Sequence, residues 1–68
     1  MQVTAILTPA PEGGFTALNP ETVTTSQGET AEQAIAALRE AAELFLEEFP
    51  LVLSGPPLVT SFTVAENA

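Results

Sequence analysis

Residues 30–49, TAEQAIAALREAAELFLEEF, form the stretch that decides the fold of this chain. They contain no glycine and no proline, and apolar side chains recur every three to four residues, which is typical of an amphipathic helix. Thr30 followed by Gln33 is a capping-box pattern at a helix start. Pro50 ends the pattern, because the residue before a proline avoids the α conformation. The sequence therefore predicts one helix with Thr30 as its N-cap.

The predicted helix has one apolar face, which needs a sheet to cover it, and one polar face. The faces emerge when successive residues are placed about 100° apart. Leu44 lies off the apolar face, so it is either an ordinary exposed leucine or part of a contact surface. The apolar face consists of Ala31, Ala34, Ile35, Leu38, Ala42, Phe45, Leu46 and Phe49. The polar face consists of Glu32, Gln33, Arg39, Glu40, Glu43 and Glu47.

Segments of alternating polarity lie on both sides of this helix and predict strands. Residues 2–8, 15–18 and 22–26 precede the helix, and turns rich in Pro, Gly and Asn separate them. Residues 58–64, LVTSFTV, follow it and alternate in the same way. The connection over residues 50–57 is stiff and unusually apolar, so we expect it to fold over one end of the core.

The predicted element order is β-β-β-α-β in one α+β domain over residues 1–68. The first three strands suit an antiparallel meander with short connections. The helix then crosses one face of the sheet, and the fourth strand most simply lies parallel to the first, in spatial order 3-2-1-4. The uncovered face carries Ile6 with either Leu18 or Val59, and it is either solvated or a dimer interface. We favour an interface, because a domain of this size is marginally stable alone.

The composition narrows the possible functions. The chain has nine acidic residues, one arginine and no histidine or cysteine, for a net charge of −8. It also lacks Asp, Lys and Tyr, so its serines have no base to activate them, and we expect no enzyme and no cofactor. This charge repels nucleic acid and attracts a basic protein. Alternatively, the glutamates only keep a small apolar domain in solution.

Three glutamates on the polar face could suggest a metal site. Glu40, Glu43 and Glu47 follow one another at one-turn spacing. They can be interpreted as ligands for a divalent ion or as a solvated face, and we favour the solvated face. Arg39 is most simply a one-turn partner for Glu43 on the helix surface.

Two features of the sequence indicate where in the cell the protein is located. Met1 leads directly into an alternating stretch without the basic region of a secretory signal. No apolar run approaches the ~20 residues that span a bilayer. We therefore expect a cytoplasmic protein that does not contact a membrane.

Several short motifs occur along the chain. They are GGFTA at residues 13–17, Pro20-Glu21, and SQGET at residues 26–30 leading into the helix. Together they resemble the HicB family, the antitoxins of HicA–HicB toxin–antitoxin pairs. The similarity covers about residues 2–48. It implies a partial ribonuclease-H-like β-β-β-α-β fold without nuclease activity. It also implies a binding module that masks a small, basic, mRNA-cleaving toxin.

The sequence departs from the family pattern in three places. The usual turn after Pro-Glu is replaced by residues 22–25, and Gln33 stands where the family has a second glutamate. Many members also carry a C-terminal DNA-binding domain, and from a sequence that ends at Ala68 we expect this protein to lack one. We therefore expect a short form without direct nucleic-acid binding.

Charge and resemblance together predict a homo-oligomeric antitoxin-like module with a HicA-like toxin as its partner. The alternative is an orphan homo-oligomeric structural domain with no toxin. The predicted partner-facing residues are Glu32, Glu40, Glu43, Leu44 and Glu47.

Overall fold

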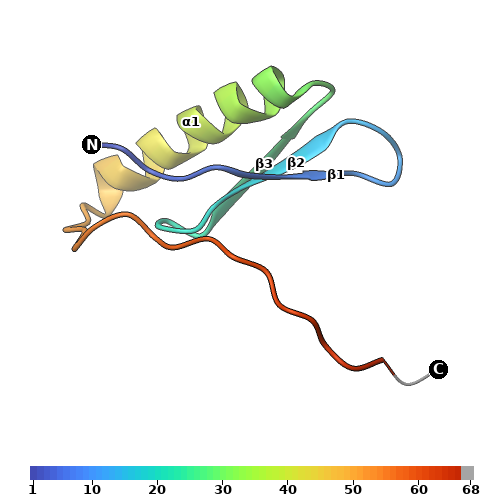
Figure 1. Cartoon of the computed structure of the whole chain (residues 1–68). Helices are drawn as coiled ribbons and strands as arrows, with labels where there is room; N and C mark the ends of the chain where they lie inside the picture. Colours follow the sequence, from blue (N-terminus) through green and yellow to red (C-terminus); the bar gives the residue numbers. More distant parts are fainter. Residues whose placement is uncertain (67–68) are drawn as a thin grey trace.

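The structure is a computed structural model that describes residues 1–66, and it contains three strands followed by one helix (Figure 1). The elements are β1 (Ile6–Pro9), β2 (Phe15–Asn19), β3 (Thr24–Gly28) and α1 (Ala31–Glu48). The strands form one antiparallel sheet in the order β1-β2-β3. The predicted α+β class is confirmed, and the first three strands form the predicted meander.

The core lies between α1 and one face of this sheet. Ala17 in the central strand is fully buried and packs with Ala34 and Leu38 of the helix, while Leu7 and Phe15 pack against this cluster. The helix contacts chiefly β3 and, to a lesser extent, β2. The molecule therefore has two layers, with α1 displaced toward the β3 side of the sheet.

The start of α1 is held by reciprocal side-chain bonds. The Thr30 hydroxyl accepts from the Gln33 backbone N–H at 3.1 Å, and the Gln33 side-chain oxygen accepts from the Glu29 N–H at 3.0 Å. The predicted N-cap is thus confirmed, although Gln33 reaches the residue before the cap rather than the cap itself. Gly28 lies so close to the first turn of α1 that a Cβ at this position would be 2.5 Å from the Ala34 backbone nitrogen.

The third strand begins two residues later than the sequence predicts. Residues 22–26 were the expected range, but β3 spans Thr24–Gly28. The side-chain oxygen of Asn19 accepts from the Thr22 N–H at 3.0 Å, and Val23 follows with a positive φ of 56°. These features extend the turn, and they leave Val23 79% exposed.

The sheet face away from α1 is largely polar. The register pairs Ile6 with Leu18 and Leu18 with Thr25 across the three strands. The residue beside Ile6 is therefore Leu18, not Val59. Both are half-buried, and Thr8 and Thr16 form an exposed pair on the same face.

The predicted fourth strand is wrong for the chain as the structure describes it. Residues 58–64 form no strand, and Figure 1 shows this segment running away from the sheet. Leu58 and Phe62 are 92% and 86% exposed. Alternating polarity makes a segment suited to a strand, but a strand is stable only when another strand satisfies its backbone. The observed order is 3-2-1, without a fourth member.

Residues 50–57, the connection after the helix, fold over the core only in part. Leu51 and Leu53 are half-buried, whereas Val52 between them is fully exposed. The extended segment that follows this connection raises the radius of gyration to 13.9 Å, compared with about 11 Å for a compact chain of this length.

Candidate functional site

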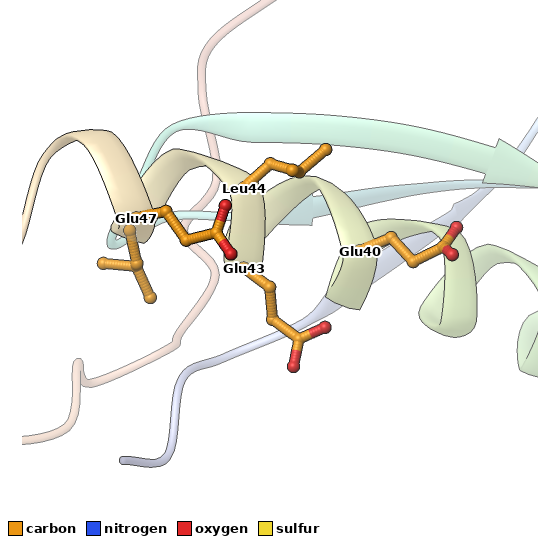
Figure 2. Close-up of a pocket in the computed structure, with 5 residues that line it drawn as sticks. Glu40, Glu43, Leu44 and Glu47 are labelled. Carbon is orange, nitrogen blue, oxygen red and sulfur yellow. The ribbon is translucent and has the colours of Figure 1, made fainter.

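The predicted partner-facing residues lie together on the outer face of α1, away from the sheet. All are exposed. One open depression on this face is lined by Glu40, Glu43, Leu44 and Glu47, together with Leu46 (Figure 2). Glu32 lines an adjoining depression that also includes Glu40 and Glu43. We call the set Glu32, Glu40, Glu43, Leu44 and Glu47 the outer stripe.

The outer stripe carries a strong excess of negative charge. Its one basic neighbour is Arg39, whose Nε lies 3.8 Å from Glu43 Oε2. Both side chains of this pair are largely exposed, so water and salt screen the interaction. The remaining carboxylates are available to accept charge-assisted hydrogen bonds from arginine or lysine side chains.

The carboxylates of the outer stripe do not converge on one point. Figure 2 shows the Glu40 and Glu43 side chains leaving the helix in different directions. Within residues 1–66, no group of three or more acidic side chains is placed to hold a metal ion. The geometry therefore suits contact with charges spread over a surface rather than ligation of one cation.

Leu44 supplies an apolar contact within this acidic surface. Its side chain is 64% exposed, and it lies beside Glu40 and Glu47 in the same depression. An apolar residue beside charged ones is a common arrangement in protein–protein interfaces.

Sequence reasoning did not identify a polar cluster at the turn between β2 and β3. Asn19 is fully buried there. Its side-chain nitrogen donates to the Thr4 carbonyl at 2.7 Å and to a Glu21 carboxylate oxygen at 2.9 Å. The Thr22 hydroxyl donates to the Asn19 side-chain oxygen. The available sequence signal was Asn19-Pro20, which predicts a turn but not its partners.

Glu21 completes this cluster by holding the N-terminal segment. Its two carboxylate oxygens accept from the Thr4 backbone N–H at 3.0 Å and from the Thr4 hydroxyl at 2.8 Å. The Thr4 backbone hydrogen bond is the main cause of a lowered pKa for Glu21, because it stabilises the charged form. These hydrogen bonds tie the N-terminal segment to the turn after β2, so we assign Glu21 a structural role.

Comparisons with protein-family models, with curated proteins and with solved structures find no match to this chain. Within the described part of the chain, no helix combines the length and apolar character that crossing a membrane requires.

Proposed function

We propose that the chain is a non-catalytic protein-interaction module, resembling a HicB antitoxin, that binds and masks a small basic HicA-like toxin. The observation that carries this proposal is the outer stripe, in which four carboxylates and Leu44 are exposed on one helix face. Because such a toxin cleaves messenger RNA, the proposal places the protein in the cytoplasm.

The charge of the molecule favours a basic protein over nucleic acid as the partner. A net charge of −8 repels a phosphate backbone and accelerates encounter with a positive surface. A regular helix also holds the outer stripe in place before binding, which lowers the entropy cost of forming the interface.

A second candidate function is an orphan homo-oligomeric domain without a toxin partner. The observation that favours it is the number of large apolar side chains left in solvent, among them Ile35, Leu58 and Phe62. Self-association would cover them, and it is compatible with toxin binding at the outer stripe. A fourth strand gained in this way would also complete the partial ribonuclease-H-like order 3-2-1-4.

Co-purification tests the first candidate function. The chain would be co-expressed with a short basic protein encoded in the neighbouring reading frame and captured through a tag. We expect a complex at about 50 mM salt that dissociates by about 500 mM, because salt screens contacts between exposed charges. Absence of a complex at low salt, with the chain itself a stable oligomer, would favour the orphan domain instead.

A further inference from the structure

An apolar groove runs between residues 1–5 and one flank of α1. It has a volume of about 590 Å³. The apolar part of its helix wall is Ile35, Leu38, Ala42 and Leu46, and the charged side chains of Arg39 and Glu43 also line it. Because α1 packs chiefly on β3 and β2, this flank extends beyond the covered part of the sheet, and Ile35 is 43% exposed. We call this feature the edge groove.

The strand wall of the edge groove presents backbone hydrogen-bonding groups. The Thr4 N–H donates to Glu21, in the turn that follows β2, and the Thr4 C=O accepts from Asn19, the last residue of β2. Successive residues of an extended chain direct these groups to opposite sides, so those of Val3 and Ala5 face outward. β1 continues this line and is an edge strand of the sheet. Such an edge is a template for a further strand.

Residues 58–64 have the properties of a strand that fits this edge. Leu58, Phe62 and Val64 share one side of the alternating pattern, and they are 92%, 86% and 63% exposed. Residues 49–65 contain no charged side chain, whereas the whole molecule carries −8. We call residues 58–64 the tail. Because the tail lies within this uncharged stretch, it is the part of the molecule that a second copy repels least.

We propose that residues 58–64 of one copy add as a strand beside β1 in the edge groove of a second copy. Reciprocal exchange gives a two-fold dimer in which each tail fills one groove. Leu58 and Phe62 then pack on the flank of α1, and the tail backbone pairs with the edge at Val3 and Ala5. This inference deepens the proposed self-association, and it does not depend on toxin binding.

The course of the tail favours a second copy over the chain's own groove. Figure 1 shows the tail leaving the end of α1 and running away from the two-layer body. After a bend at Ser54 and Gly55, Pro56 and Pro57 favour an extended backbone, because proline fixes its own φ and restricts the residue before it. A proline-rich connection acts as a semi-rigid arm that reaches outward.

Cross-linking distinguishes the two arrangements, because the natural chain has no cysteine. A Gln2→Cys variant would be mixed with a Ser61→Cys variant, equilibrated, and treated with a short bis-maleimide. We expect a covalent mixed dimer. In the control, Ala36→Cys on the exposed outer side of α1 replaces Gln2→Cys and should give far less product. In a double Gln2→Cys/Ser61→Cys variant, a cross-linked monomer at every protein concentration would overturn the exchange.

Sedimentation measures the apolar contact itself. Phe62→Ser should weaken dimerisation by about 10- to 100-fold, while Ser61→Ala on the other side of the tail should leave it unchanged. Phe62 is exposed in the single chain, so its replacement leaves the folded monomer intact. A dimer that Phe62→Ser does not weaken, or a natural chain that stays monomeric, would contradict the proposal. Either failure leaves toxin binding at the outer stripe untouched.

Discussion

At the scale of single residues, the turn after β2 depends on a few buried polar contacts. Asn19 joins three parts of the chain, because its amide bonds Thr4, Glu21 and Thr22. A buried amide without partners is costly, whereas this one is satisfied on both its nitrogen and its oxygen. The cluster fixes the N-terminal segment that forms the strand wall of the edge groove.

The Glu21 carboxylate makes folding stability depend on pH. Its folded pKa is lowered from the usual 4.5, so its contribution is fully present above that value. The contribution is lost as pH falls through the folded pKa. We expect Glu21→Gln to lower the free energy of unfolding at neutral pH and to lose this disadvantage in acid. Urea unfolding of both proteins between neutral and strongly acidic pH measures the difference, and a gap that stays constant or widens in acid would contradict the assigned role.

At the scale of elements, the junction between β3 and α1 gives two residues of SQGET, Gly28 and Thr30, a role in the fold itself. Gly28 allows the first turn of the helix to approach the strand, and Thr30 caps that turn. Both features are local. These two residues of the motif therefore have a structural explanation within this chain.

Replacing Gly28 should disturb this junction strongly. Gly28→Ala would place a Cβ within 2.8 Å of the Gln33 backbone and side chain, as well as against Ala34. We expect a loss of about 1–3 kcal/mol in the free energy of unfolding, as for an overpacked core. Gln27→Ala, at an exposed position of the same strand, should change it by no more than about 0.5 kcal/mol. Chemical denaturation compares the two, and equal stabilities would contradict the close approach.

The elements also show how far the sequence could predict this fold. The helix, its cap and the meander could be predicted, because they depend on local signals: the periodicity of apolar residues and the turn residues between segments. The start of β3 could not, because it depends on Asn19 bonding across the turn. The fourth strand could not be predicted either, because alternation in residues 58–64 does not show whether another strand pairs with them.

The outer stripe was predictable because helical spacing alone places its members on one face. The edge groove was not, because it depends on where α1 crosses the sheet.

At the scale of the whole molecule, two surfaces divide the proposed functions. The outer stripe is acidic and lies on the exposed side of α1, whereas the edge groove is mostly apolar and lies beside residues 1–5. Glu43 lines both surfaces. The tail is uncharged and matches the groove rather than the stripe. Self-association through the tail would therefore leave the outer stripe, apart from Glu43, open to a basic partner.

The central claim is that the outer stripe binds a small basic toxin, and matched charge variants test it most directly. Glu40→Gln, Glu43→Gln and Glu47→Gln combined remove three charges from the stripe, and Glu12→Gln, Glu29→Gln and Glu66→Gln remove three elsewhere. Calorimetric titration at low salt with the basic protein from the neighbouring reading frame would give each affinity. We predict about a 10- to 100-fold loss for the stripe variant and less than about a threefold change for the control. Equal losses, or no loss in the stripe variant, would contradict the claim.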